Sequence, residues 1–154
     1  MELRQYLPSD CEALADVFYR SVHAIDRKHY SAEELGAWAD GSVDVAEWNQ
    51  AFLSRHTVVA EVDGVVVGFG DMDATGYLDR LFVLPEFQRR GIASALCDEL
   101  EKSTRAQMVS VRASRVARTF FESRGYTVKA RRWARRQGVD LEYFEMELAM
   151  RNSA

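Results

Sequence analysis

Apolar residues in the first third of the chain recur at helical spacing. Leu14, Phe18 and Val22 lie four residues apart, so one face of a helix over residues 10–28 is apolar. In a capping box, a short polar side chain accepts from a helix amide and an acidic side chain three residues later reaches back. Three pairs have this spacing: Ser9 with Glu12, Ser31 with Glu34, and Asp44 with Glu47. We therefore expect three helical segments within residues 10–54, after a short strand at 2–6.

The pattern changes at Thr57, where β-branched residues become frequent. Residues 57–62 and 65–69 are mostly apolar and are separated by an Asp-Gly pair, which favours a tight hairpin turn. A third strand of this group is expected at 77–83, where Pro85 stops it.

The second half of the chain alternates between helical and extended patterns. The predicted elements are helices over 91–104 and 115–124 and strands at 107–112, 126–132 and 140–150, the last two antiparallel. A strand followed by a helix and a second strand requires a right-handed crossover, and therefore a parallel pair. The predicted fold class is α/β, with a mixed, mostly antiparallel sheet that contains one parallel pair and is flanked by helices.

Length and composition exclude several classes of protein. With 154 residues, 47% of them hydrophobic, the chain is predicted to form a single domain over residues 1–154. No apolar run reaches the ~18 residues that a membrane span needs, so no membrane partner is expected. The two cysteines form no CxxC motif and the N-terminal residues lack the apolar stretch of a signal peptide, which predicts a cytoplasmic protein. The three histidines are too scattered to form a metal site, so no metal is expected.

The net charge of -4 conceals an uneven distribution. Residues 1–79 carry 5 Lys and Arg against 15 Asp and Glu, residues 80–136 carry 14 against 5, and residues 137–154 carry 1 against 4. Such a division favours an anionic ligand beside the middle segment and a cationic ligand near the first. The alternative is that both signs are solvated surface.

The segment over residues 81–94 carries the densest chemical signal. A strand runs into a turn whose small residues leave the backbone amides uncovered, and the turn opens a helix. The first amides of a helix lack internal partners and lie at the positive end of its dipole. The turn is therefore suited to a phosphate or pyrophosphate, with Arg89 and Arg90 adding charge. Taken alone, such a turn is also typical of ordinary connections between a strand and a helix.

Gln88, Gly91 and Ala93 form a Gln-x-x-Gly-x-Ala pattern at this junction. The pattern resembles motif A of the GNAT superfamily of acyl-CoA N-acyltransferases, and the predicted elements follow the order of that family over nearly the whole chain. The resemblance implies the GNAT fold and an acetyl-CoA-dependent N-acetyltransferase whose turn holds the cofactor pyrophosphate. The cofactor-binding residues implied there are Gln88, Arg89, Arg90, Gly91, Ile92, Ala93 and Ser94.

The resemblance also implies a bulge in the preceding strand, near Leu81 to Val83, which separates this strand from its parallel neighbour. The pantetheine arm then lies in the gap and bonds to free backbone groups of Leu81, Phe82 and Val83. The amides of Phe82 and Val83 are expected to polarise the thioester carbonyl. Ser114, where the family often has Asn, offers a hydroxyl to an amide of the cofactor.

A base is needed because an acceptor amine is mostly protonated near neutral pH. Asp79 is the candidate, because it is an acid within an apolar strand and alternation puts it on the same face as Tyr77 and Leu81. The alternative is that Asp79 pairs with a neighbouring arginine or faces solvent.

The residue that protonates the departing thiolate in many members of the family is absent. Phe121 stands where those members have tyrosine, so it is expected to serve only packing and the shape of the cofactor site. Tyr126 is a substitute candidate. Solvent is another, because a thiolate with a pKa of about 8.5 is a tolerable leaving group.

The acceptor site is expected at the early helices and the hairpin rim, which flank the acyl end of the cofactor in the family. Tyr30 and Trp38 are candidates to line it around a cation or a ring. The alternative is that they belong to the core, as aromatics at helical spacing more often do. Asp71 and Asp73 are expected to attract an amine, and the acidic first segment favours a cationic one.

Two hypotheses follow for the function. One is transfer of an acetyl group from acetyl-CoA to a primary amine of a small molecule or peptide, by direct attack in a ternary complex. The other is a non-catalytic acyl-CoA sensor or regulatory protein, which the missing tyrosine favours. The identity of the amine and the choice of acyl donor beyond acetyl are left open by the sequence.

Residues 131–136 contain four arginines around Trp133 and an alanine. Clustered arginines around an aromatic suit nucleic acid. In an acidic protein, this short run is interpreted as a solvated hairpin rim, and no nucleic-acid partner is expected. The resemblance is compatible with a homodimer.

Overall fold

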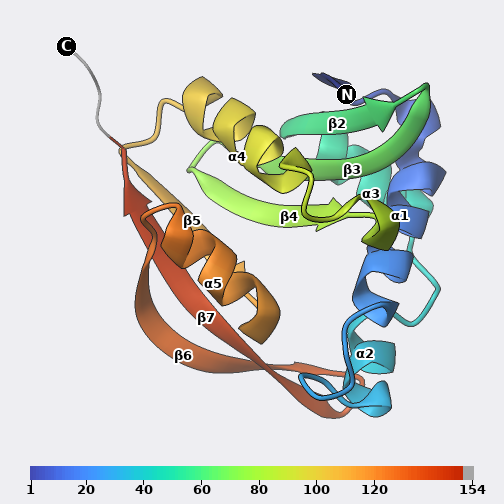
Figure 1. Ribbon diagram of the computed structural model, residues 1–154, viewed down its shortest axis with the longest axis vertical. Helices are drawn as coiled ribbons and strands as arrows, with labels where there is room; N and C mark the ends of the chain where they lie inside the picture. Colours follow the sequence, from blue (N-terminus) through green and yellow to red (C-terminus); the bar gives the residue numbers. More distant parts are fainter. Residues whose placement is uncertain (151–154) are drawn as a thin grey trace.

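The computed structural model describes residues 1–150, and within them seven strands form one sheet (Figure 1). Across the sheet their order is β1-β2-β3-β4-β5-β7-β6. All neighbouring strands are antiparallel except β4 and β5, which are parallel. The predicted mixed sheet with one parallel pair is therefore confirmed. The strands are β1 Glu2–Gln5, β2 His56–Val62, β3 Val65–Met72, β4 Tyr77–Val83, β5 Met108–Ala113, β6 Thr127–Arg136 and β7 Val139–Ala149.

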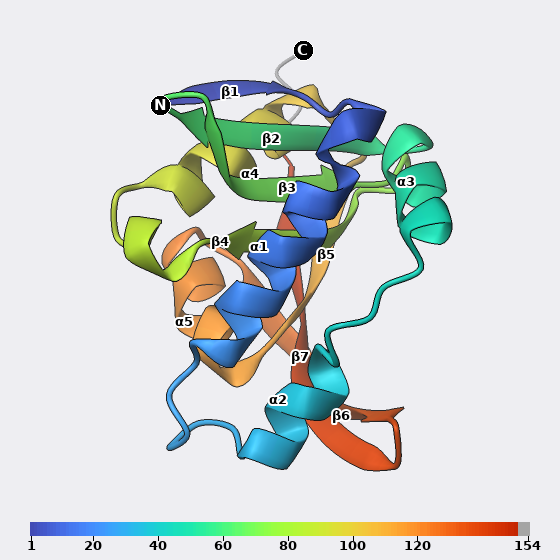
Figure 2. The ribbon, with the colours of Figure 1, turned by 90° about the vertical axis from the view of Figure 1, so that its right-hand side faces the viewer.

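Helices cover both faces of the sheet, with α1, α2 and α3 on one face and α4 and α5 on the other (Figures 1 and 2). The helices are α1 Cys11–His23, α2 Ala32–Trp38, α3 Val45–Leu53, α4 Ile92–Ser103 and α5 Arg115–Ser123, with short 3-10 turns at Pro8–Asp10 and Pro85–Phe87. No helix within residues 1–150 is long and apolar enough to cross a membrane.

Two glycines of β3 allow α4 to pack closely on the sheet. A Cβ atom at Gly68 would lie 3.4 Å from Ile92, and one at Gly70 would lie 3.0 Å from Leu100. On the opposite face the core is aromatic, and the rings of Phe18 and Phe82 meet edge to face at 5.0 Å. These contacts hold the centre of the sheet, at β3 and β4, between α4 and α1.

The predicted capping box at the start of α2 is confirmed. Ser31 Oγ accepts from the Glu34 amide at 3.1 Å, and Glu34 Oε1 accepts from the Ser31 amide at 2.8 Å. Asp44 caps α3 by accepting from the Glu47 amide at 3.1 Å.

The first helix differs from the prediction at both ends. Ser9 lies in a 3-10 turn and does not cap α1, because the Asp10 carboxylate beside it accepts from the Leu7 amide at 2.8 Å and forms the local turn. At its other end α1 stops at His23 rather than near Lys28. Asp26 accepts from the Lys28 amide at 2.9 Å, so a side-chain turn replaces a further turn of helix.

The basic run at 131–136 lies within β6, which extends beyond the predicted 126–132. β7 pairs with β6 along nearly its whole length. Carboxylates of β7 meet most arginines of the run: Glu142 with Arg131 at 2.5 Å, Glu145 with Arg132 at 2.8 Å, and Asp140 with Arg135 at 3.1 Å. The run is therefore a largely ion-paired strand at the sheet edge.

Candidate active site

The parallel strands β4 and β5 separate after a short ladder. Tyr77 pairs with Ser110 and Leu78 with Val111, and the pairing stops there. Gly76 holds the closed end, where its carbonyl accepts from the Ser110 amide at 3.0 Å. Gly76 has a φ of 91°, and a Cβ atom on it would lie 2.4 Å from the carbonyl oxygen of β5 that it faces, so only glycine fits this position. Beyond the ladder, the edge of β4 that faces β5 is left without a strand partner.

A bulge in β4 lies at Asp79. Arg80 pairs with Asp71 of β3, and the next pair is Leu78 with Met72. Asp79 is therefore an extra residue in the strand. An extra residue reverses the alternation of side chains on its two sides.

This position corrects two predictions. The family resemblance implied a bulge near residues 81–83, but the bulge lies before them, at Asp79. Asp79, Arg80 and Phe82 all line the α1–α3 side of the sheet, whereas Leu81 lies near the residues under α4. The expectation that Asp79 and Leu81 share a face is wrong, because the bulge separates them.

Only alternate backbone groups of β4 face the gap. The Leu84 amide donates to the Val67 carbonyl of β3 at 2.8 Å. Because successive residues direct their backbone groups to opposite edges of a strand, Phe82 also uses its groups on the β3 side, while Leu81 and Val83 face β5. Of the two amides predicted to polarise a carbonyl in the gap, that of Val83 is directed toward it and that of Phe82 is not.

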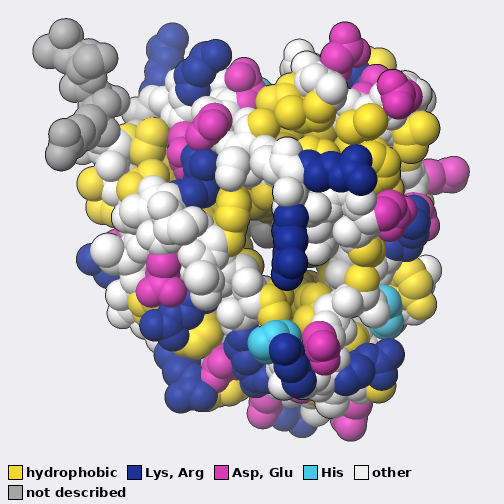
Figure 3. All heavy atoms as spheres, viewed as in Figure 1, with side chains coloured by type: hydrophobic (Ala, Val, Ile, Leu, Met, Phe, Trp, Pro, Cys, Tyr) yellow, Lys and Arg dark blue, Asp and Glu magenta, His cyan; other side chains and the backbone are white. Residues whose placement is uncertain are grey.

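The turn between β4 and α4 has backbone amides without acceptors. Gly91 precedes α4 with a φ of 80° and provides no side-chain cap. Within residues 1–150, the amides from 89 to 94 make no hydrogen bond to a protein acceptor. A Cβ atom on Gly91 would meet nothing within 4 Å, so the space beside the turn is open. Figure 3 has the same view as Figure 1, in which α4 and α5 face the reader, and it shows Lys and Arg side chains over a hollow on this face.

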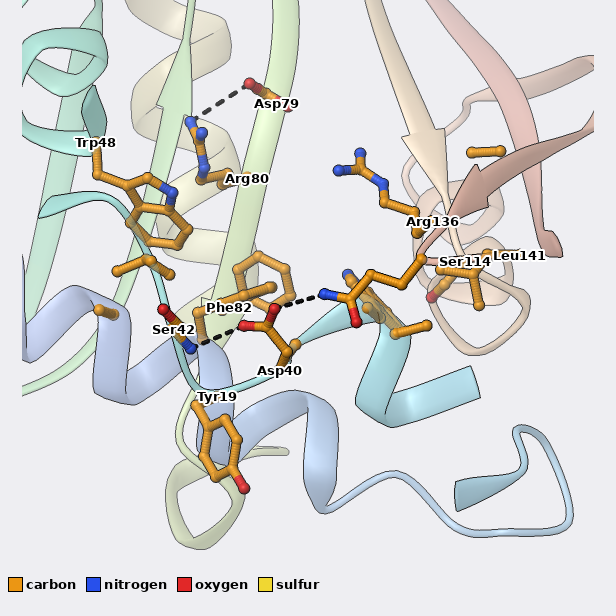
Figure 4. A pocket seen from close by; sticks show the side chains of 18 of the residues that line it. Tyr19, Asp40, Ser42, Trp48, Asp79, Arg80, Phe82, Ser114, Arg136 and Leu141 are labelled. Carbon is orange, nitrogen blue, oxygen red and sulfur yellow. Dashed lines mark hydrogen bonds and ion pairs between the residues drawn. The ribbon is translucent and has the colours of Figure 1, made fainter. Parts of the chain in front are cut away.

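A cavity of about 1070 Å³ lies on the α1–α3 side, where β4 and β5 separate. Its walls come from α1, the segment around α2 and α3, β4, β5 and the β6–β7 hairpin (Figure 4). Asp40 Oδ2 accepts from Gln137 Nε2 at 2.5 Å, which joins the loop after α2 to the β6–β7 turn. On the opposite side of the cavity, the Arg80 guanidinium lies over the Trp48 ring, 4.8 Å from the ring centroid.

Asp79 belongs to a network of two acids and two arginines. Its Oδ2 pairs with Arg55 at 2.5 Å and Arg80 at 3.4 Å, and Asp71 pairs with the same arginines at 3.4 and 2.9 Å. Asp71 is fully buried, and this burial raises the pKa of its carboxyl, while the Arg80 charge acts in the opposite direction. The Asp79 side chain is 28% exposed, and its Oδ1 accepts no hydrogen bond within the described part of the chain. The arginine pairing considered for Asp79 is present, and one carboxylate oxygen is left for a ligand.

Tyr30 is a buried strut between three segments. Its hydroxyl accepts from the Arg115 amide at 2.9 Å and donates to the Glu142 carbonyl at 3.4 Å. Trp38 packs on Tyr30 with ring centroids 5.7 Å apart. Both residues line the cavity, but the bonds and 2% exposure of Tyr30 favour the core alternative for that residue.

The structure does not bring Tyr126 to the cavity. Its hydroxyl donates to Glu101 of α4 at 2.6 Å, and its ring packs on Phe121 at 5.1 Å. Both rings are buried, and neither lines the cavity, which argues against Tyr126 as the proton donor. Ser114 does line the cavity; it caps α5 by accepting from the Ala117 amide at 3.2 Å, which leaves its hydroxyl hydrogen for a ligand.

Two acids expected to attract an amine are occupied elsewhere. Asp71 is buried against Arg80, and Asp73 accepts from the Thr75 and Tyr77 amides at 2.9 and 3.1 Å.

Arg55 is a residue of the site that the sequence analysis missed. It is one of only five basic residues in the acidic first segment, and this rarity was the signal that could have pointed to it.

Known proteins resemble this chain in sequence and in fold. The model of the acetyltransferase (GNAT) domain family matches residues 26–149. The chain is 38% identical over 133 residues to YafP of Escherichia coli K12, an uncharacterized N-acetyltransferase, and the match covers 86% of this chain and 85% of that protein. The crystal structure of a GCN5-related N-acetyltransferase from Rhodopseudomonas palustris superposes with a TM-score of 0.91 at 32% identity, covering 96% of this chain and 94% of that one.

A more distant structure adds a bound ligand. The PaiA N-acetyltransferase from Thermoplasma acidophilum, solved in complex with coenzyme A, has a TM-score of 0.78 at 21% identity and covers 96% of this chain and 98% of that one. The match over residues 26–149 and the extensive identity to YafP show that this chain belongs to the GNAT family of N-acetyltransferases.

Proposed function

We propose that the protein transfers an acetyl group from acetyl-CoA to a primary amine of a small molecule or peptide, by direct attack in a ternary complex. The observation that carries this proposal is the separation of β4 from β5. It leaves an unpaired strand edge beside an open turn, and the large cavity borders the same division. A donor in the gap and an acceptor in the cavity would meet at β4.

The chain's groups fit an acyl-CoA. The amides of residues 89–94 beside the open space at Gly91 suit a pyrophosphate, with Arg89 and Arg90 adding positive charge. The β5-facing groups of Leu81 and the amide of Val83 suit the amide groups of an extended pantetheine arm, with the Ser114 hydroxyl on the other side of the gap. The Val83 carbonyl is already used, because it accepts from Ser21 Oγ at 2.9 Å and from Gln88 Nε2 at 3.2 Å. When bound, acetyl-CoA supplies the thioester carbonyl from which the acyl group is transferred.

Asp79 is the proposed base. It is at the bulge where the two strands part, and its Oδ1 is free of protein partners within the described residues. Arg55 and Arg80 hold the other oxygen and orient the carboxylate. Taking a proton from the ammonium form of the acceptor, directly or through one water, leaves the amine lone pair available for attack. With Tyr126 bonded to Glu101, the thiolate takes its proton from solvent.

The outer wall of the cavity supports a cationic amine. Asp16, Asp40, Asp44 and Glu47 all line this wall, on α1 and on the segment from α2 to α3. Carboxylates on this wall attract an alkylammonium group on its way to Asp79.

The experiment is to follow free thiol while the purified protein is incubated with acetyl-CoA and a panel of amines, polyamines, amino acids and peptides. We expect thiol release that depends on particular amines, and a rise in Tm with acetyl-CoA alone. A raised Tm without turnover over a broad panel would support a non-catalytic sensor instead. No change in Tm would contradict both.

A further inference from the structure

The walls of the cavity carry opposite charges. The α1–α3 side has the four acids named above, whereas the side made by β5 and β6 has Arg112, Arg135 and Arg136. Arg80 and Glu142 also line the cavity, but both are held in ion pairs. Figure 4 shows Arg136 extending from β6 on the side of the cavity opposite Trp48. If the acceptor carried only a cationic amine, the arginines would have no group of the acceptor to bind.

Asp79 and Arg112 stand at the two sides of the opening between β4 and β5. The last pair of the parallel ladder is Leu78 with Val111, so these two residues are the next on each strand. Both line the cavity, yet they make no ion pair, because Asp79 is held by Arg55 and the Arg112 guanidinium lies over the Tyr143 ring at 5.2 Å. Burial raises the pKa of the nearby Tyr77 hydroxyl, with the Asp79 charge adding to the rise and the Arg112 charge opposing it.

Arg112 and Arg136 differ from the other arginines of this part of the sheet. Within the described residues, Arg80 and the β6 arginines at 131, 132 and 135 each have a carboxylate partner, whereas Arg112 and Arg136 have none. Glu145, opposite Arg112 in the β5–β7 register, pairs with Arg132 instead. Two exposed guanidinium groups therefore line the cavity without a carboxylate partner in the described residues.

The shape of the cavity favours a compact ligand. Its volume of about 1070 Å³ slightly exceeds the ~300–1,000 Å³ of typical small-molecule sites, so the volume alone does not select the ligand. The bond between Asp40 and Gln137 spans the cavity rim from the α2–α3 loop to the β6–β7 turn. A peptide chain passing that way would have to break this bond, whereas a small molecule would not.

We propose that the acceptor is a small zwitterion of the amino-acid type, whose amine lies at Asp79 and whose carboxylate or phosphate is bound by Arg112 and Arg136. This inference rests on the proposed acetyl transfer and narrows its acceptor. Guanidinium groups are suited to this role because their planar donors match both anions.

The test uses amines that differ by one anionic group. The pairs are lysine with cadaverine, arginine with agmatine, tryptophan with tryptamine, methionine with methioninamide, and phosphoethanolamine with ethanolamine. Thiol release from acetyl-CoA gives kcat/KM for each, and the rise in Tm in the presence of CoA gives binding without turnover. The variants are Arg112→Gln and Arg136→Gln. The matched control is Arg105→Gln, an exposed arginine without a carboxylate partner in the described residues that does not line the cavity.

We expect at least one anion-bearing amine to exceed its partner about tenfold in kcat/KM, which corresponds to about 1.4 kcal/mol. The larger preference among the carboxylate and phosphate pairs identifies the anion. Arg112→Gln and Arg136→Gln should each raise the acceptor KM about tenfold and remove that preference, while the KM for acetyl-CoA changes less than about twofold. Arg105→Gln should change neither.

Equal or better activity of the plain amine in every pair would overturn the inference and leave the proposed function intact. A raised KM for acetyl-CoA alone in Arg112→Gln would also overturn it, because the arginine would then serve the donor. Absence of turnover with every amine would count against the proposed function. In that case the rise in Tm with each amine in the presence of CoA still tests the inference, because binding of the anionic group needs no reaction.

Discussion

The turn that begins α4 and the cavity on the opposite face of the sheet are built in different ways. The turn is one continuous segment whose amides, from 89 to 94, have no hydrogen-bond acceptor within the described residues. The cavity combines side chains from α1 to β7, and its central acid, Asp79, is held by Arg55 from another part of the chain. A local site can be recognised from its spacing, whereas an assembled site depends on strand register and on long-range ion pairs.

The largest expected effect tests the local site. Gly91→Glu should weaken acetyl-CoA binding about a thousandfold, because an anion in the turn repels the phosphates and two or more charge-assisted hydrogen bonds of about 1.5–3 kcal/mol each are lost. Titration calorimetry measures the affinity. Gly64→Glu is the matched control, since Gly64 has a similar φ of 77° against 80° and equally open surroundings, but lies in the β2–β3 turn. Similar losses in both variants would show that strain, rather than the turn's role, is responsible.

The ion-pair network supporting the assembled site is expected to be the next most sensitive. Asp71→Ala leaves Arg80 without its fully buried partner and should lower the free energy of unfolding by about 3 kcal/mol. Urea denaturation measures this loss. Asp140→Ala removes an exposed partner of Arg135 and should cost less than about 1 kcal/mol. Equal effects would mean that burial of the network contributes nothing.

Asp79, the proposed base, lies where a donor in the gap and an acceptor in the cavity would meet. Asp79→Asn should lower kcat about a hundredfold and flatten its pH profile, because the base is lost, while the affinity for acetyl-CoA stays nearly unchanged. Asp73→Asn is the control: it removes a nearby carboxylate that bonds to its own turn, and asparagine can keep those bonds. An unchanged pH profile in Asp79→Asn would rule out the role of base.

The smallest effect concerns the acid stability of the cavity wall. Burial acts to raise the pKa of Glu142, but hydrogen bonds from Arg131 and Arg115 hold it below its usual range. The folded protein therefore favours the ionised form, which stabilises it above the ordinary pKa of about 4.5; this contribution is lost as the pH falls through the lower pKa of the folded state. Glu142→Gln should cost about 1–2 kcal/mol at pH 7 and progressively less below pH ~4.5. Urea midpoints across that range measure the difference; a constant difference would contradict this assignment.

Some elements followed the sequence closely because neighbouring residues determine them. The box at Ser31 and Glu34 needs only one turn of helix, and the uncovered turn at Gly91 needs only a strand before it and a helix after it. The end of α1 was predicted less well. An aspartate turn at Asp26 competes there with an apolar periodicity that continues to Ile25.

The catalytic assignments show the limit of local pattern. Tyr126 was plausible from its position after α5, but its hydroxyl is used by Glu101 of α4, which no local spacing indicates. Phe82 was expected to offer its amide in the gap, yet pairing with β3 turns that amide to the other edge. Both depend on which element lies next to the residue.

The family, the mixed sheet and the turn with uncovered amides before α4 could be predicted from the sequence alone, because alternation, helix periodicity and a glycine at a helix start act over a few residues. Three features follow only from the tertiary structure: the position of the bulge, the pairing of Asp79 with Arg55 and the two charged walls of the cavity. These features arise where distant segments meet. There, strand register and competition among charges select the partner of each side chain.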